Sequence, residues 1–264
     1  MLHEPTMQKL NAMKLFGMAQ AFEEQLQQPQ FTELSFEDRL TLLVERQWID
    51  KEDRALRTRL TFSGLKQTAC IEDIDYRSAR GFKRAQIEQL ARCEWVRYHQ
   101  NCIISGPTGV GKSFIGCALA QKACREGYRS LYFYEPKLLR QLQIAQADGS
   151  MVKLLKKIAR VDLLLIDDWG ISKVHDTQHR QLLEILEDRQ GSGSTLVTTQ
   201  FPVTKWHELI SDPTVADAIV DRLVHSAHRI ELEGESMRRK KTGRQMSADH
   251  HAPNEPPALR KDEL

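Results

Sequence analysis

The chain has 264 residues, of which 41% are hydrophobic and 28% charged, and its formal net charge is only +2. This length suits one ordinary domain with an appendage, or two modest domains, and the composition is typical of soluble globular proteins. No apolar run approaches the roughly 18 residues that a membrane span needs, and the start, MLHEPTMQKL, lacks the features of an export signal. We therefore expect a cytoplasmic protein without membrane contact.

Residues 1–70 show helical periodicity and no strand-like alternation, which predicts a small all-helical N-terminal domain. Residues 7–27 are expected to form one amphipathic helix that Pro29 ends. A second helix is expected to begin after Ser35, whose spacing to Asp38 resembles a capping box, and to run to about residue 60. Its buried stripe is predicted to consist of Leu40, Leu43, Val44 and Trp48.

Residues 71–244 have a different texture, in which short apolar runs alternate with helical segments. Residues 71–98 of this part, with a helix expected near 78–97, lead into the alternating runs, which begin at residue 101. The expected strands are NCIIS, SLYFY, DLLLID, STLVTT and HRIEL, and the expected helices are 112–126, 136–160, 176–190 and 215–227. This alternation predicts an α/β fold, with a parallel sheet flanked by helices. Residues 245–264 are expected to be a disordered tail.

Basic residues gather at three places, although the chain as a whole is nearly neutral. Residues 54–66 and 76–87 each contain four basic side chains and no acid, and MRRKKTGR at 237–244 forms a third group. One such group is usually a solvated face, whereas three together favour a partner with a phosphate backbone.

The stretch GPTGVGKS at 106–113 satisfies the phosphate-binding pattern GxxxxGK[ST]. It follows the expected strand NCIIS and opens an expected helix, which is the context that the pattern needs. Glycines let backbone amides surround an anion, the lysine places a charge between the outer phosphates, and the serine hydroxyl can bind Mg²⁺. An ordinary glycine-rich turn is the weaker alternative. The predicted nucleotide-binding residues are Gly106, Pro107, Thr108, Gly109, Val110, Gly111, Lys112 and Ser113.

Two adjacent carboxylates, Asp167 and Asp168, end the apolar run LLLI. We expect this strand to lie beside the strand of the phosphate loop, so that its carboxyl end reaches the same ligand. Asp167 is then the predicted partner of Mg²⁺, together with Ser113, and Asp168 is the predicted residue that orients or activates the attacking water. Two surface acids that open a loop are the alternative.

With these motifs in view, the sequence resembles the IstB-like ATPases, helper proteins encoded beside the transposase in certain bacterial insertion sequences. The resemblance spans roughly residues 7–241 and is carried by ISGPTGVGKS, LLLIDDWG, the helical start KLNAMKLFGMAQAFEEQ and the block at 195–238. It implies an AAA+ core with a lid that is short or absent. It also implies assembly on duplex DNA in the presence of ATP, and stimulation of a transposase. The related DnaC-type helicase loaders share this core.

The resemblance also implies roles for single residues. Gln200 matches the polar residue that senses the γ-phosphate, with Thr199 as its backup. Arg222 matches the arginine finger that reaches a neighbouring subunit's ATP, and Arg238 matches a second sensor arginine. ATP-hydrolysing AAA+ motors most often carry Glu where Asp168 stands. Because a displacement of about 1 Å can lower a rate about 10²-fold, we expect hydrolysis that is slow or waits for a partner.

The expected function is therefore that of an ATP-dependent, DNA-binding helper ATPase in transposition. Its expected cofactors are ATP and Mg²⁺, and its expected partners are duplex DNA, a cognate transposase and further copies of the chain. A helicase loader is the main alternative, and the N-terminal helices, which choose the partner, would distinguish it. A small-molecule kinase is disfavoured by the paired acids and Gln200. An adaptor that binds ATP without hydrolysing it stays open because of Asp168.

Overall fold

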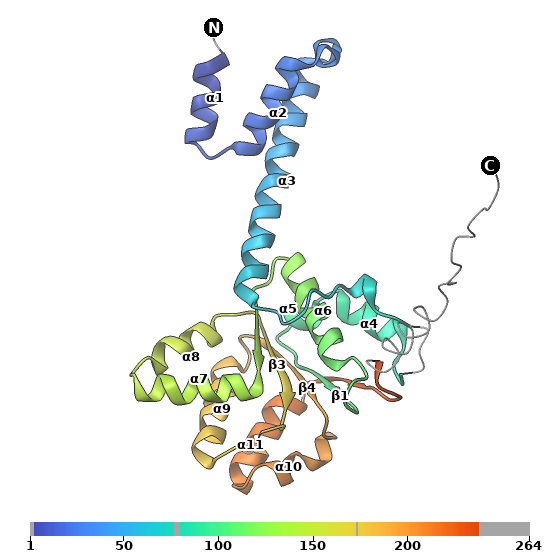
Figure 1. The fold of residues 1–264 in the computed structure, drawn as a ribbon, viewed down its shortest axis with the longest axis vertical. Coiled ribbons are helices and arrows are strands. Elements are labelled where there is room, and N and C mark those ends of the chain that lie inside the picture. Colours follow the sequence, from blue (N-terminus) through green and yellow to red (C-terminus); the bar gives the residue numbers. More distant parts are fainter. Residues whose placement is uncertain (1–2, 77–79, 173, 238–264) are drawn as a thin grey trace, which may run out of the picture.

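The computed structural model describes residues 3–76, 80–172 and 174–237, and consists of a helical arm joined to an α/β body (Figure 1). The arm contains α1 (His3–Ala12), α2 (Phe16–Gln27), the short helix η1 (Pro29–Glu33) and α3 (Phe36–Ser63). α2 packs against α3, and the carboxyl end of α3 reaches the body, where it contacts β2 and α6. Among the described residues, no helix is both long and apolar enough to cross a membrane.

The body is built on one parallel sheet of five strands in the order β2-β3-β4-β1-β5. All five expected strands are confirmed, and with them the expected α/β class. The strands are β1 (Cys102–Ser105), β2 (Ser130–Tyr134), β3 (Leu163–Trp169), β4 (Ser194–Thr199) and β5 (His228–Glu231).

Helices cover both faces of the sheet, and side-chain alternation along the strands divides the core accordingly. In β3, Leu163 and Leu165 pack in the cluster with one set of helices, and Leu164 and Ile166 pack in the other. The first set is α4 (Arg84–Ala91), α5 (Glu94–Arg97) and α6 (Lys112–Arg125). The second set is α7 (Glu135–Ala147), α8 (Met151–Ala159), α9 (Asp176–Arg189), α10 (Trp206–Leu209) and α11 (Pro213–Val224).

Three helices that were expected to be continuous are interrupted, so those expectations were wrong. The breaks separate α1 from α2, α4 from α5 and α7 from α8, and each contains a residue in the left-handed region. These residues are Lys14, Cys93 and Gly149, with φ of 60°, 58° and 75°. A left-handed residue ends the run of helical hydrogen bonds, so the chain changes direction there.

The buried stripe expected along α3 was also wrong. Ser35 does cap the helix, because its hydroxyl accepts a hydrogen bond from the Asp38 amide at 3.1 Å. However, Val44 and Trp48 are 51% and 61% exposed, because α2 packs on another face of α3. There Gly17 lies so close to α3 that an added Cβ would be 2.7 Å from a backbone oxygen. The spacing of apolar residues predicts that α3 has an apolar face, but it does not identify the face of α3 that α2 covers.

Candidate nucleotide-binding site

The phosphate loop connects the carboxyl end of β1 to the first turn of α6, as the motif predicted. Gly106, Gly109 and Gly111 have φ of 142°, 86° and 102°, which non-glycine residues rarely adopt. A Cβ on Gly106 would also lie 2.2 Å from the carbonyl oxygen of Leu232. No side chain of the described residues caps the first turn of α6, so its amide groups can donate hydrogen bonds to an anion.

Two side chains bring polar groups to this loop. Lys112 is 5% exposed, and its Nζ lies 2.8 Å from the carbonyl oxygens of both Gly106 and Pro107. Thr108 donates a hydrogen bond of 2.7 Å to Oε1 of Gln200, the residue that follows β4. The structure therefore brings Gln200 to the phosphate loop. Ser113 is half-buried in the first turn of α6, and the side chain of Val110 packs in the core.

Asp167 lies at the carboxyl end of β3 with no solvent exposure. Its Oδ1 accepts a hydrogen bond from the Thr198 hydroxyl at 2.6 Å, and its Oδ2 accepts one from the Tyr132 hydroxyl at 2.9 Å. Nζ of Lys66 lies 3.8 Å from the same Oδ2. Residues of β3 two and four positions earlier face α6, so the alternation of the strand directs Asp167 to the same side.

One part of the prediction for this strand was wrong: β3 does not lie beside the strand of the phosphate loop. β4 lies between β3 and β1, and pairs with both. The carboxyl ends of parallel strands nevertheless meet at one edge of the sheet, so Asp167 and the phosphate loop occupy the same edge. Thr198 on the intervening strand β4 binds Asp167 through its hydroxyl.

Asp168 occupies an irregular position. Its φ is 61°, and the register between β3 and β4 shifts between Ile166 and Trp169. Its amide donates a hydrogen bond of 3.0 Å to the hydroxyl of Thr198. A bulge of this kind turns a side chain away from the alternation of the strand. Asp and Asn tolerate left-handed φ better than Glu, so the backbone itself favours Asp at this position.

Sequence reasoning missed three residues that organise this edge. Thr198 binds the carboxylate of Asp167 and the amide of Asp168, so it connects both acids. Burial, followed by the charge of Asp167, raises the pKa of Tyr132, so its phenol stays protonated and donates. Glu135, at the start of α7, is 1% exposed and accepts hydrogen bonds from the amides of residues 170 and 172 at 2.7 and 3.2 Å. Polar residues at strand ends were the available signal.

The side-chain hydrogen bonds that the structure describes for Thr199 lie at the end of β4, and not at the phosphate loop. The hydroxyl of Thr199 donates to the carbonyl of Trp169 at 2.9 Å and accepts from the amide of Phe201 at 3.1 Å. These bonds hold the end of β4 and the loop that follows it. Arg238 lies outside the described residues.

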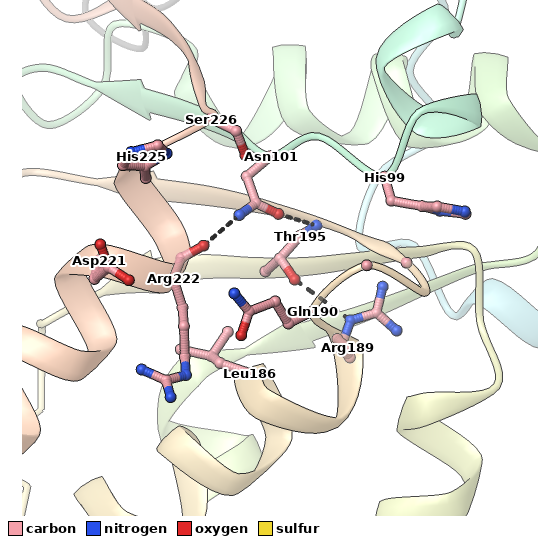
Figure 2. A pocket seen from close by; sticks show the side chains of 12 residues that line it. His99, Asn101, Leu186, Arg189, Gln190, Thr195, Asp221, Arg222, His225 and Ser226 are labelled. Atoms are coloured by element: carbon pink, nitrogen blue, oxygen red, sulfur yellow. Dashed lines mark hydrogen bonds between the residues drawn. The ribbon is translucent and has the colours of Figure 1, made fainter.

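Arg222 lies at the opposite edge of the sheet, in a pocket of about 310 Å³ (Figure 2). Asn101, just before β1, donates to the carbonyl oxygen of Arg222 at 2.7 Å and accepts from the amide of Thr195 at 2.9 Å. These contacts mark the amino ends of β1 and β4. The guanidinium of Arg222 pairs with Glu187 and donates to the carbonyl of Ala218 at 2.9 Å. Arg222 therefore does not belong to the nucleotide site of its own chain.

Several side chains of the predicted basic groups are engaged within the molecule. Arg54 pairs with Asp50, and Nε of Arg59 donates to the carbonyl of Cys124 at 2.8 Å. Arg80 is 5% exposed, and residues 238–244 lie outside the described part of the chain.

The structure assembles a basic surface that the sequence did not predict. It is a groove of about 770 Å³ beside α8, lined by Phe62, Arg129, Lys153, Lys156, Lys157 and Arg160, among others.

A five-stranded parallel sheet of this order, with a phosphate loop between β1 and α6 and a buried carboxylate at the end of β3, defines a P-loop protein of the AAA+ class. The chain belongs to the family of IstB-like ATP-binding proteins, whose model matches residues 8–245. An insertion sequence ATP-binding protein of Sinorhizobium fredii is 48% identical over 239 residues, which are 90% of this chain and 98% of the relative. One from Pseudomonas fluorescens, of IS1162, is 42% identical over 76% of this chain and 88% of its own length.

Solved structures share the fold at lower identity. The DnaC helicase loader has a TM-score of 0.55 at 20% identity, over 62% of this chain and 96% of its own. DnaA of Aquifex aeolicus, solved with bound AMPPCP, has a TM-score of 0.54 at 18% identity, over 75% of this chain and 59% of its own. These likenesses confirm the AAA+ fold that the sequence predicted.

The first prediction concerns Thr198, which joins the two acids. Thr198→Val removes both of its hydrogen bonds, and we expect the free energy of unfolding to fall by about 1–2 kcal/mol because a buried carboxylate loses a donor. Thr199→Val, which also removes two buried hydrogen bonds, is the matched control. Urea unfolding with ADP, in Mg²⁺ and in EDTA, measures both effects. We expect the extra stabilisation by Mg²⁺ to shrink in Thr198→Val but not in Thr199→Val, and equal shrinkage would contradict the role of Thr198.

Proposed function

We propose that this protein is an ATPase that binds ATP with Mg²⁺, assembles on duplex DNA and assists the transposase of an insertion sequence. One observation carries the proposal: the phosphate loop, the buried Asp167 and Gln200 converge at one edge of the sheet. Family membership and the relatives named as insertion sequence ATP-binding proteins support the nucleotide and the biological setting.

The donor set at this edge fits a magnesium ion. Mg²⁺ prefers oxygen ligands, usually one or two carboxylates completed by phosphates and water. Asp167 offers a buried carboxylate whose hydrogen-bond donors, Thr198 and Tyr132, are neutral hydroxyls, and Ser113 offers a further oxygen. A bound ion would supply charge that offsets the phosphate oxygens. Lys112 and the amides of α6 would bind the phosphates, and Gln200 would contact the terminal one.

Asp168 is the proposed residue that orients the attacking water. The bulge separates it from Asp167, so one acid faces α6 and the other lies half-buried outside the strand alternation. Its side chain is one methylene shorter than that of Glu, so the carboxylate reaches less far toward a water. This supports slow hydrolysis in the isolated chain.

Arg222 is the proposed finger for a neighbouring copy. Its position at the amino ends of the strands separates it from its own phosphate loop, which lies at the carboxyl ends. A head-to-tail contact between copies would join one edge of the sheet to the opposite edge of the next chain. Hydrolysis would then require assembly.

The groove beside α8 is the proposed DNA contact. Its five basic side chains are exposed, and no acid lies among the residues that line it. Lysines and arginines on one exposed surface bind phosphates without sequence preference.

A helicase loader is the alternative function, but the likeness to DnaC concerns the fold alone, and relatives from insertion sequences favour the transposition helper. Co-purification with a replicative helicase, rather than with the transposase, would reverse this choice.

The second prediction tests Asp168. Asp168→Asn keeps the shape and tolerates the left-handed φ, so we expect unchanged stability and unchanged ATP binding. Loss of a group that activates water should lower the rate of hydrolysis by about 10²-fold or more. Asp167→Asn is the comparison, and should weaken binding of ATP in Mg²⁺. Phosphate release in the presence of DNA measures the rate. A turnover of tens per second by the wild-type chain alone would contradict slow, assembly-dependent hydrolysis.

The third prediction tests whether Arg222 acts between copies. Lys112→Ala and Arg222→Ala should each hydrolyse ATP poorly. In an equimolar mixture, an active contact needs the intact phosphate loop of one variant beside the intact arginine of the other. If copies exchange at random, about a quarter of the contacts are active, so the mixture should regain about a quarter of wild-type activity. Activity no higher than the mean of the separate variants would contradict this role, as would full activity of Arg222→Ala alone.

The fourth prediction tests the groove beside α8. Replacing both Lys156 and Lys157 with Ala should weaken binding to duplex DNA and lower the slope of log K against log salt by about two, because each phosphate contact contributes about 0.9. The control replaces Lys137 and Arg140 of α7, which are exposed and outside the groove. Fluorescence anisotropy across a salt series gives both slopes. Equal changes in the two double variants would contradict a contact at this groove.

A further inference from the structure

Lys66 lies where the helical arm meets the nucleotide site. α3 ends at Ser63, Gly64 adopts a φ of 59°, and Leu65 packs against the core. The next side chain, Lys66, places its Nζ 3.8 Å from Oδ2 of Asp167. We call residues 59–66, where α3 ends and meets the body, the foot of the arm. The foot therefore places a positive charge beside the carboxylate that is proposed to bind Mg²⁺.

The environment of Asp167 makes this charge important. Its carboxylate has no exposure, and its hydrogen-bond donors, Thr198 and Tyr132, are neutral. A buried carboxylate is costly without a cation, so the ion pair with Lys66 stabilises it. A divalent ion bound at the same carboxylate would repel the ammonium, because the two cations would compete for one anionic partner.

Lys66 also has a second partner close by. Its side chain is 47% exposed, so it is not confined to the ion pair. Its Nζ lies 5.2 Å from the ring centroid of Tyr134, at the end of β2, where a cation is attracted to the aromatic face. Strand pairing sets Tyr134 opposite Asp167, so the ammonium can leave the carboxylate and still remain near the aromatic ring.

Because α3 is long, a small rotation at its carboxyl end displaces its far end by a larger distance. α3 has 28 residues and is therefore about 42 Å long at 1.5 Å per residue, and α2 packs along its far part with α1 against α2 (Figure 1). Close to Lys66, Arg59 donates to a backbone carbonyl of α6, and Arg129 lies over the ring of Phe62 at 4.8 Å. A rotation of a few degrees at the foot would displace the tip of the arm by several ångströms.

We propose that Lys66 is a positioning residue that couples the nucleotide site to the helical arm. It pairs with Asp167 when no divalent cation is bound there, and it leaves the carboxylate when Mg²⁺ arrives with the nucleotide, which loosens the foot of α3. This coupling rests on the proposed function, because it assumes that the site takes a magnesium nucleotide. It gives Lys66, one of the basic residues grouped at 54–66, a role other than phosphate-backbone contact.

The test compares Lys66→Met with Lys66→Arg, which keeps the charge, and with Lys137→Met, which removes an exposed lysine elsewhere in the body. Titration with fluorescent ADP in Mg²⁺ and in EDTA gives the affinities. Because a half-exposed ion pair is weak, we expect Lys66→Met to lower the Kd by about three- to fivefold in Mg²⁺ only. In EDTA the variant should bind no tighter than wild type, since it has lost a positive charge. Lys66→Arg and Lys137→Met should match wild type in both buffers.

Hydrogen exchange of residues 60–70 supplies a readout independent of activity. In the wild-type chain, exchange should rise when ADP and Mg²⁺ are added, whereas in Lys66→Met it should be high already and change little. Unaltered Mg²⁺ dependence in Lys66→Met, or an equal gain in both buffers, would overturn the coupling alone. Failure of the wild-type chain to bind ADP in either buffer would overturn the proposed function, and the coupling with it.

Discussion

The charge of Asp167 is the constraint around which the nucleotide edge of the molecule is arranged. A carboxylate without solvent exposure is strongly disfavoured unless donors and cations surround it. Its partners come from β2, β4 and the segment after α3, so three parts of the chain meet at one side chain. Each hydroxyl that donates to it is fixed by the register of a strand. The sheet therefore holds a negative charge in place before any ligand binds. The free energy needed to position that charge is part of the free energy of folding, so it is not required again when a ligand binds.

The phosphate loop complements this charge with the opposite sign. Its glycines hold the backbone in conformations that expose amide donors, and Lys112 is buried against the loop itself. The positive loop at the end of β1 and the negative group at the end of β3 are separated by the width of one strand, β4. Thr198, on that strand, binds Asp167 on one side. Gln200, just after the strand, binds Thr108 of the phosphate loop on the other. β4 would thus determine the spacing between the phosphate and the Mg²⁺ that are proposed to bind here.

The sequence predicted the parts of this site that local pattern determines. The phosphate loop and the five strands follow from spacing and hydrophobicity within short windows, and Asp167 from its place at the end of a buried strand. Strand order and register are set by contacts between distant segments, so Thr198 and Tyr132 could not be identified as partners of Asp167. The left-handed conformations of Lys14 and Cys93 could not be predicted either, because only glycine adopts such φ values readily and neither residue is a glycine.

The two edges of the sheet carry opposite halves of the proposed chemistry, and this limits how copies can act together. The phosphate loop lies at the carboxyl ends of the strands, and Arg222 lies at the amino ends, held by Glu187 on α9. A head-to-tail contact would bring the amino edge of one sheet to the carboxyl edge of the next, and with it Arg222 to the neighbour's nucleotide site. Such a contact must also separate Arg222 from Glu187, a half-exposed pair of modest strength. In the proposed mechanism, the isolated chain therefore holds Arg222 in an ion pair with Glu187, and assembly would break that pair.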